Sequence, residues 1–281
     1  MVRRRIEKAN SRIRVLDVLM RAAAILFIPM LITSVILFSK QKVQSGAEQF
    51  AEQKISNPAG IRSEISLPDG SVVWLNSEST ISYKVPFVGG TERKVELIGE
   101  AFFKVKKNEQ VPFQVETGSV SVTVLGTEFN CKAFPEDSLI EVVLAEGSIK
   151  LNSMDSKTGA KEFIMKPGER AVVDKMRNDT KISTENIEKY IGWHQNKLIL
   201  DECPMPEIAR RLERWYGVEV EIVDPKIENI KISSTFENEP LNEILEMLEI
   251  ATPIKVEQIP AKMAVSSDAP RKRKVLISSA K

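Results

Sequence analysis

The chain has 281 residues, enough for about two domains of ordinary size. Its composition, 42% hydrophobic and 28% charged, is that of a folded protein. A net charge of +1 excludes a global electrostatic field that would point to nucleic acid or to an acidic partner. The local distribution is more informative, because residues 1–21 carry seven basic and two acidic residues.

The first predicted element is a membrane segment at residues 22–38, where the sequence AAAILFIPMLITSVILF contains no charge. With residues 15–21 the stretch reaches about 24 residues, close to the roughly 20 that a spanning helix needs. A cleaved signal peptide and a buried globular helix are the alternatives. The basic residues 1–21 predict a cytoplasmic N-terminus, with the rest outside the cytoplasm. Pro29 lies inside the segment and predicts a kink.

Residues 39–60 are polar and predict a linker, and residues 61–175 predict a β domain. Short apolar or alternating runs recur there between turn signals such as Pro68-Asp69-Gly70. Many strands at this spacing favour a sandwich or an antiparallel jelly roll over a parallel α/β sheet. The expected strands are 71–75, 94–98, 101–105, 113–116, 120–125, 129–134, 140–144, 148–151, 162–165 and 171–173.

A second linker is expected at residues 176–190, followed by a small α+β module at residues 191–281. Two helical patterns each begin near a proline and align with each other at an offset of 36 residues. The apolar face of the first is Ile208, Ala209, Leu212, Trp215 and Tyr216, and that of the second is Leu241, Ile244, Leu245 and Leu248. Each copy reads strand, helix, strand, and a last strand at 274–278 closes one sheet that carries both helices on one face. The basic run 271–274 predicts an exposed hairpin edge, and in this orientation no nucleic-acid partner is expected.

Chemistry of a conventional enzyme has little support in this sequence. His194 is the single histidine, which disfavours most nucleophile–base pairs and zinc sites. No phosphate-binding, dinucleotide-binding or hydrolase motif occurs, so no cofactor and no metal are predicted. Cys131 and Cys203 are the only cysteines, and they are either two buried apolar residues or one disulfide.

The predicted β domain contains an ordered set of motifs. They are Leu67-Pro68-Asp69-Gly70-Ser71, Trp74-Leu75-Asn76, Ser79-Thr80-Ile81-Ser82-Tyr83, Gly99-Glu100-Ala101-Phe102-Phe103-Lys104-Val105, Pro112-Phe113-Gln114-Val115-Glu116-Thr117, Val124-Leu125-Gly126-Thr127-Glu128-Phe129-Asn130 and Lys166-Pro167-Gly168-Glu169. In this order they resemble the periplasmic domain of FecR-type anti-sigma factors, and the resemblance covers about residues 61–278. The C-terminal module, which opens with Trp193 and Leu198, resembles the module that follows in the Bacteroidota branch. That module is similar to the short N-terminal domains of secretins and TonB-dependent receptors.

The resemblance implies a jelly roll in the middle domain and a single-pass regulator of the inner membrane with its bulk in the periplasm. The implied partners are the signalling domain of an outer-membrane TonB-dependent receptor and an extracytoplasmic-function sigma factor. Family members usually carry a helical sigma-binding domain before the span, whereas about 20 residues precede it here. A membrane-anchored periplasmic binding or scaffold protein without sigma contact is therefore the alternative.

The sequence offers two candidate sites, one implied by the resemblance and one from its aromatic residues. Some members of the family cleave themselves between a Gly and a Thr, which correspond to Gly126 and Thr127 in this sequence. The alternative for this pair is a glycine bulge followed by an ordinary threonine. Trp193, Trp215 and Tyr216 are the aromatic candidates for a partner interface, although the last two also lie on the apolar helix face and fit a core.

Overall fold

A computed structural model of the chain describes residues 27–38, 51–85, 87, 92–155, 159–260 and 272–280. The chain divides into two compact units, Met1–Gln49 and Phe50–Lys281. The first unit contributes one described helix, residues 27–38, with exposed apolar side chains such as Phe27, Leu31 and Phe38. Within the part of the chain that the structure describes, no helix combines the length and the hydropathy needed to cross a membrane.

Residues 22–26 of the predicted membrane segment lie outside the described residues. The Thr33 hydroxyl donates hydrogen bonds to the carbonyl oxygens of Pro29 and Met30, at 2.9 Å each. Pro29 is the third described residue of the helix, so most of the turn before it lies outside the described residues. The kink at Pro29 therefore stays a prediction.

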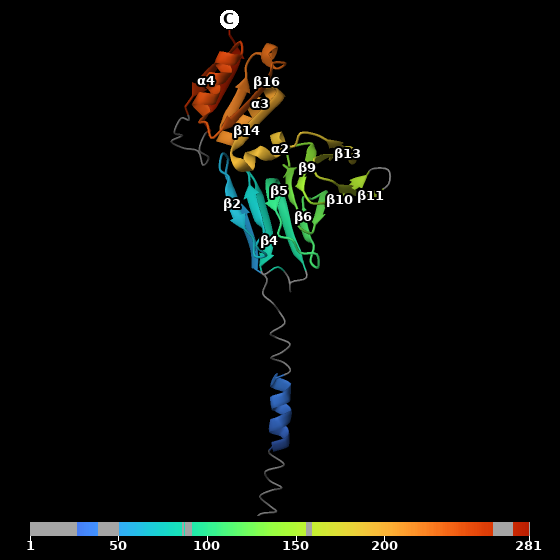
Figure 1. The fold of residues 1–281 in the computed structure, drawn as a ribbon. Helices are drawn as coiled ribbons and strands as arrows, with labels where there is room; N and C mark the ends of the chain where they lie inside the picture. The colour runs from blue at the N-terminus through green and yellow to red at the C-terminus, as the bar shows by residue number, and fades with distance from the viewer. Residues whose placement is uncertain are drawn as a thin grey trace, which may run out of the picture. The chain divides into compact units, whose positions relative to one another are not determined.

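The second unit begins with a β domain of thirteen strands (Figure 1). The strands alternate with short turns and one strand, β5, is twice the usual length. Their bounds are β1 Ala51–Ser56, β2 Ser63–Ser66, β3 Val72–Leu75, β4 Thr80–Val85, β5 Arg93–Lys104, β6 Phe113–Glu116, β7 Val120–Val124, β8 Glu128–Ala133, β9 Leu139–Glu146, β10 Ile149–Asp155, β11 Gly159–Met165, β12 Glu169–Asp174 and β13 Asp179–Thr184.

These strands form two layers that share β5. Layer A has the order β1-β4-β5-β6-β7-β10-β11, and layer B has the order β2-β3-β5-β8-β9-β12-β13. Residues 93–98 of β5 pair within layer A and residues 99–104 pair within layer B. Gly99 makes this crossing possible with a φ of +100°, and a Cβ there would lie 2.3 Å from Ser79 Oγ.

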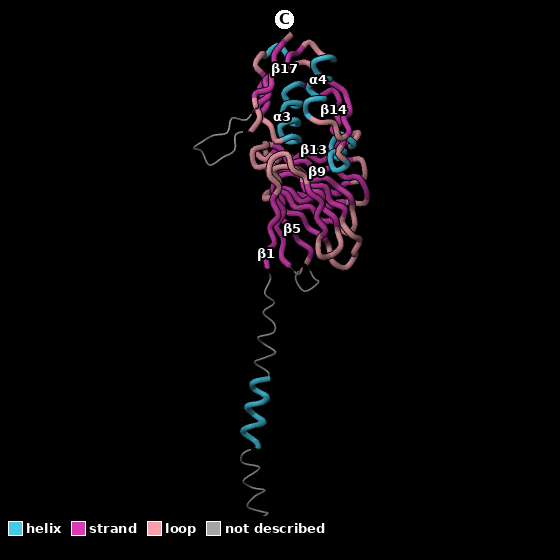
Figure 2. The backbone as a smooth tube through the Cα atoms, turned by 90° about the vertical axis from the view of Figure 1, so that its left-hand side faces the viewer, coloured by secondary structure: helices cyan, strands magenta, loops and turns pink. Residues whose placement is uncertain are grey.

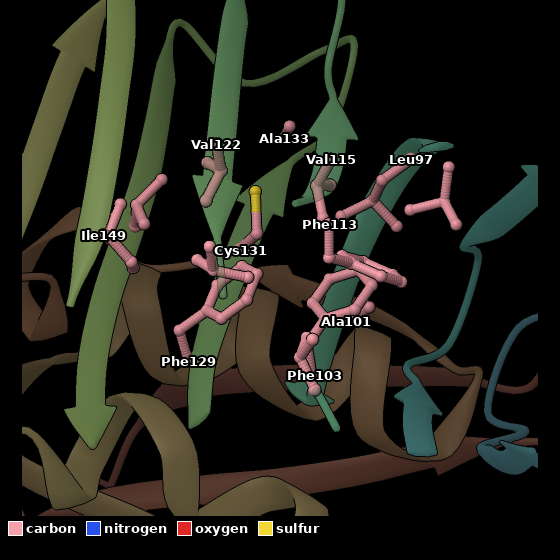
Figure 3. Close-up of a cluster of buried hydrophobic side chains, with 14 of the residues drawn as sticks. Leu97, Ala101, Phe103, Phe113, Val115, Val122, Phe129, Cys131, Ala133 and Ile149 are labelled. Atoms are coloured by element: carbon pink, nitrogen blue, oxygen red, sulfur yellow. The ribbon is translucent and has the colours of Figure 1, made fainter. Parts of the chain in front are cut away.

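One apolar core fills the space between the layers (Figure 3). Phe103, Phe113 and Phe129 are fully buried there, and the rings of Phe103 and Phe129 stack at 5.0 Å between centroids. All three lie in strands that the sequence predicts, at 101–105, 113–116 and 129–134. The expected jelly roll is not confirmed, because β5 runs through both layers and pairs in parallel with β6.

The C-terminal module starts with the helix α2 (Glu188–Ile191) and the 3-10 helix η2 (Gly192–Gln195). The predicted repeat is present as two strand–helix–strand copies, followed by one further strand (Figure 2). The first copy is β14 (Lys197–Pro204), α3 (Met205–Tyr216) and β15 (Glu219–Ile222). After the 3-10 helix η3 (Pro225–Ile227) the second copy is β16 (Lys231–Glu237), α4 (Leu241–Ala251) and β17 (Ile254–Ile259), and β18 (Lys274–Ser279) ends the module.

The module contains two small sheets where one was expected. Strand β14 pairs antiparallel with β16, and β18 lies between β15, which is parallel to it, and β17, which is antiparallel. The buried faces of α3 and α4 share one core with residues of both sheets, such as Leu198 and Ile277. Equivalent strands of the two copies thus lie in the same sheet, as pseudo-twofold symmetry requires.

Both expected linkers contain strands of the β domain. Residues 51–56 of the expected linker 39–60 form β1, and residues 179–184 of the expected linker 176–190 form β13. Both are edge strands, and most of their side chains are exposed or half-exposed. Such strands lack the apolar alternation that marks a buried strand, so pairing with β4 and β12 defines them and local sequence does not.

Candidate functional site at the interface between the two domains

The C-terminal module packs on the outward face of layer B through α2 and η2. Trp193 is 7% exposed, and its Nε1 donates a hydrogen bond to Asn130 Oδ1 of β8 at 3.0 Å. The His194 ring stacks on Phe102 of β5, with 3.9 Å between centroids and an interplanar angle of 1°. Phe102 points away from the core but is only 2% exposed, because η2 covers it. Burial lowers the pKa of His194, because desolvation disfavours the charged imidazolium.

A buried polar network continues from Trp193 into the β domain. Asn130 Nδ2 donates to Glu100 Oε1 and Asn76 Nδ2 donates to Glu100 Oε2, at 2.8 Å each. Burial raises the pKa of Glu100, although Lys132 and the two amide donors act in the opposite direction. All the buried side chains of this network have hydrogen-bond partners, so the network is rigid and specific.

Beside the network, alternating charges connect layer B to α2. Glu141 bonds Lys132 at 3.1 Å and Arg170 at 2.6 Å, and Arg170 also bonds Glu185 at 3.2 Å. The Tyr190 hydroxyl of α2 donates to Glu185 at 2.6 Å, which is the main reason that the pKa of Glu185 falls to about 2. The ionic strip therefore extends the docking of the module beyond Trp193.

The turn between β3 and β4, Asn76–Ser79, connects this network to the start of the domain. Ser77 and Ser79 are 1% and 0% exposed, and Ser79 Oγ accepts a hydrogen bond from the Glu100 amide at 2.8 Å. The Ser77 hydroxyl accepts from the Gly60 amide at 2.7 Å, and the Ser79 carbonyl accepts from the Asn57 amide at 2.9 Å. The β3–β4 turn thus holds the segment that joins β1 to β2.

A second contact places that same segment against the end of α3. Gly60 and Gly217 have φ values of +76° and +65°, and their backbones lie close together. A Cβ on Gly60 would lie 2.9 Å from the carbonyl carbon of Tyr216, and a Cβ on Gly217 would lie 2.9 Å from the carbonyl oxygen of Ala59. Next to them, the Arg62 guanidinium lies 3.8 Å from the centroid of the Trp215 ring. Within the module, the Tyr216 hydroxyl donates a hydrogen bond to the Glu239 carbonyl at 2.5 Å, which holds the C-terminal end of α3 in place.

Ion pairs form the third contact between the domains. Arg214 Nη2 lies 2.9 and 3.0 Å from the two carboxylate oxygens of Asp137, and its guanidinium lies 4.0 Å from the centroid of the Phe134 ring. Lys272 pairs with Glu78 of the β3–β4 turn at 2.8 Å. Two clefts, of about 920 and 640 Å³, share Arg214 and Asp137 in their walls. This part of the interface is therefore polar and hollow, unlike the two apolar cores.

Two of the three predicted aromatic residues, Trp193 and Trp215, contact residues of the β domain. Trp215 and Tyr216 are also partly buried against the core of the module, which agrees with the core interpretation of both. A role of the three residues in binding a separate partner stays a prediction.

Gly126 and Thr127 lie in the bend between β7 in layer A and β8 in layer B. A Cβ on Gly126 would lie 2.7 Å from Lys107 Cα, so the close approach of the neighbouring backbone explains the glycine. Thr127 is 3% exposed, and its hydroxyl donates to the Ser148 carbonyl at 3.0 Å. This carbonyl is not a base that could take the hydroxyl proton, so self-cleavage stays a prediction without a geometric argument in its favour.

The two cysteines are free and lie in separate cores. Burial raises the pKa of Cys131 to about 12 and that of Cys203 to about 11, so both thiols are unreactive. Among the residues that the structure describes, no three His, Cys, Asp or Glu side chains are placed to hold a metal ion.

Sequence reasoning missed Glu100, Asn76 and Asn130 as site residues, although the motifs include all three. One signal was available, since a carboxylate stands beside the apolar run Ala101-Phe102-Phe103. A charged residue in such a strand is rarely buried without a partner.

Comparisons with known proteins agree on one family. The model of the FecR protein matches residues 53–150 and the model of the FecR C-terminal domain matches residues 197–263, together more than half of the chain. Two crystal structures of a "putative anti-sigma factor" from Parabacteroides distasonis, at 2.50 and 1.65 Å resolution, superpose with TM-scores of 0.65 and 0.66. Each is 27% identical in sequence to this chain, and each match covers 82% of this chain and 100% of the crystallised chain. No curated protein matches the chain significantly. The chain is thus a member of the FecR family, of the FecR type of anti-sigma factor.

Proposed function

We propose that this chain is a single-pass inner-membrane regulator that relays a signal from an outer-membrane TonB-dependent receptor to an extracytoplasmic-function sigma factor. The observation that carries the proposal is the tandem of a FecR domain and a FecR C-terminal domain, joined in one compact unit. The crystallised relative, named as an anti-sigma factor, shares this unit over its whole length. The proposed periplasmic location rests on the basic residues 1–21 and the apolar segment 22–38.

The sigma-factor half of the proposal is tested in the bacterium that makes the protein. We expect deletion of the gene to change transcription from the promoter of one extracytoplasmic-function sigma factor by about tenfold, a change of 1.4 kcal/mol in an equilibrium. We also expect that sigma factor to co-purify with the tagged full chain from membranes. If no such promoter responds and no sigma factor co-purifies, the chain is a membrane-anchored scaffold.

The location is tested by labelling single added cysteines in intact cells with a maleimide that cannot cross the inner membrane. The native Cys131 and Cys203 are 0% and 2% exposed, so they give little background. Met176 is 85% exposed, and we expect Met176→Cys to be labelled from the periplasm. The matched control is Ser11→Cys in the basic N-terminal stretch, which should react only after the inner membrane is opened. The reverse pattern would contradict the proposed orientation.

A further inference from the structure

Strand β1 is the weakly held edge of layer A. Its six residues, Ala51–Ser56, pair with β4 alone among the described strands, and only Ile55 is partly buried. One side-chain hydrogen bond, between the hydroxyls of Ser56 and Thr80 at 2.8 Å, adds to the backbone pairing. An edge strand with so little burial opens more easily than the strands inside the sheet.

The residues that follow β1 fasten it to the β3–β4 turn. Asn57 donates from its backbone to the Ser79 carbonyl and from Nδ2 to the Leu75 carbonyl, at 2.9 and 2.8 Å. Its Oδ1 accepts from the Ser63 hydroxyl at 2.9 Å. The bonds to the Ser79 carbonyl and the Ser77 hydroxyl end on the β3–β4 turn, and the bond to the Leu75 carbonyl ends on the residue before it, so the C-terminal end of β1 is held by this turn.

The C-terminal module holds the same turn from the other side. Trp193 reaches Asn76 through Asn130 and Glu100, four side chains joined by three hydrogen bonds of 3.0, 2.8 and 2.8 Å. Lys272 reaches Glu78 directly at 2.8 Å.

The turn itself depends on this support, because Glu78 has a φ of +56°. A residue with a Cβ adopts this left-handed conformation at a cost, and it persists where the surroundings hold it in place. The module's Lys272 binds the side chain of that very residue. Removal of the module would therefore take away a support of a strained turn and leave Asn130 Oδ1 without its donor.

From these contacts we propose that docking of the C-terminal module and pairing of β1 are coupled through the β3–β4 turn, so that a partner which displaces the module loosens β1 from β4. The use of this coupling as a relay rests on the proposed function, while the coupling itself does not. Strand β1 comes directly after the unit that holds the apolar helix, so it stands between the module and the predicted membrane segment in the chain.

The test is hydrogen exchange of backbone amides in residues 50–281. This part of the chain is one compact unit with two apolar cores, and crystals of the relative cover 82% of the chain. In Trp193→Phe, which keeps an aromatic ring but removes the indole N–H, we expect the β1 amides to exchange about tenfold faster. The opposite edge of layer A, β11, is the internal control and should keep its rate.

A second pair of variants tests the link through Glu78. Lys272→Ala should speed exchange in β1 about threefold. Lys150→Ala is the matched control, since Lys150 also pairs across strands, with Glu162 at 2.6 Å, and is 47% exposed against 45% for Lys272. The control should leave β1 unchanged.

Two results would overturn the coupling. In the first, β1 exchanges at the wild-type rate in both Trp193→Phe and Lys272→Ala. In the second, β1 and β11 accelerate together, which would indicate general destabilisation. No sigma factor or receptor enters this measurement, so its failure is distinguishable from a failure of the proposed function.

Discussion

The two halves of β5 lie in the same strand but in different surroundings. In residues 93–98, within layer A, buried and exposed residues alternate, and Ile98 is 51% exposed. In residues 99–103, within layer B, every residue is buried, and Phe102 at an outward position is 2% exposed. Each half has one apolar residue at an outward position, Ile98 in the first and Phe102 in the second, and only Phe102 is covered, by His194 of the module. The C-terminal module covers one layer and leaves the other in water, so the contrast measures what docking contributes.

The strongest test of this contrast replaces one outward residue in each half. We expect Phe102→Ala to lower the free energy of unfolding by about 4 kcal/mol, since a buried ring is lost together with its stacking on His194. Ile98→Ala should cost less than about 1 kcal/mol, because the side chain is already half exposed. Urea unfolding of residues 50–281 measures both. Equal losses would mean that the module does not stabilise layer B.

A smaller effect is expected from glycines with the same backbone conformation in the two surroundings. Gly60 and Gly118 have φ values of +76° and +78°, but a Cβ on Gly118 would meet nothing within 4 Å. Gly118→Ala should therefore cost only the conformational strain, about 1 kcal/mol. Gly60→Ala should cost about 3 kcal/mol, because its Cβ would also push against Tyr216. If the two variants unfold at the same urea concentration, the contact between Gly60 and α3 is not tight in solution.

The smallest effect concerns pH. Burial lowers the pKa of His194 from its ordinary value of 6.5, so the unfolded chain takes up a proton first as the pH falls. The stability that His194 contributes is therefore complete above pH 6.5 and is lost as the pH falls through the lowered pKa. The raised pKa of Glu100 changes stability in the opposite direction but is common to wild type and variant.

His194→Phe keeps the stacking on Phe102 and removes the titration. Between pH 7.5 and pH 5.5, we expect the melting temperature of wild type to fall by about 2 °C more than that of His194→Phe. Parallel pH profiles for the two proteins would show that His194 is already solvated in the docked state.

The contrast also explains how far the sequence predicts this molecule. The spacing of apolar residues along the chain is enough to predict the strands around Phe113 and Phe129 and the helices with Ile208 and Ile244, because each of these elements buries one face. This spacing fails for β1 and β13, which are defined by pairing, and for the division of the module into two sheets. Those features depend on partners that are distant in the sequence.

The site was harder to predict than the fold for the same reason. Trp193 stands out in the sequence, but its partner Asn130 is 63 residues away. Glu100 and Asn76 occupy positions that look like ordinary outward positions of a strand and a turn. The position of the module over layer B is recorded in no local pattern, and the carboxylate of Glu100 beside an apolar run is the one local signal of this network.

The pairing of strand β1 also determines how much of the chain before the β domain is held in the sheet. While β1 is paired, the sheet begins at Ala51, and once it is released the first firmly held residue is Asn57. The stretch that precedes Asn57 then gains six residues without strand pairing, or roughly 20 Å of contour length. For the proposed membrane-anchored regulator, a docked module would therefore correspond to a shorter connection to the apolar segment and a displaced module to a longer one.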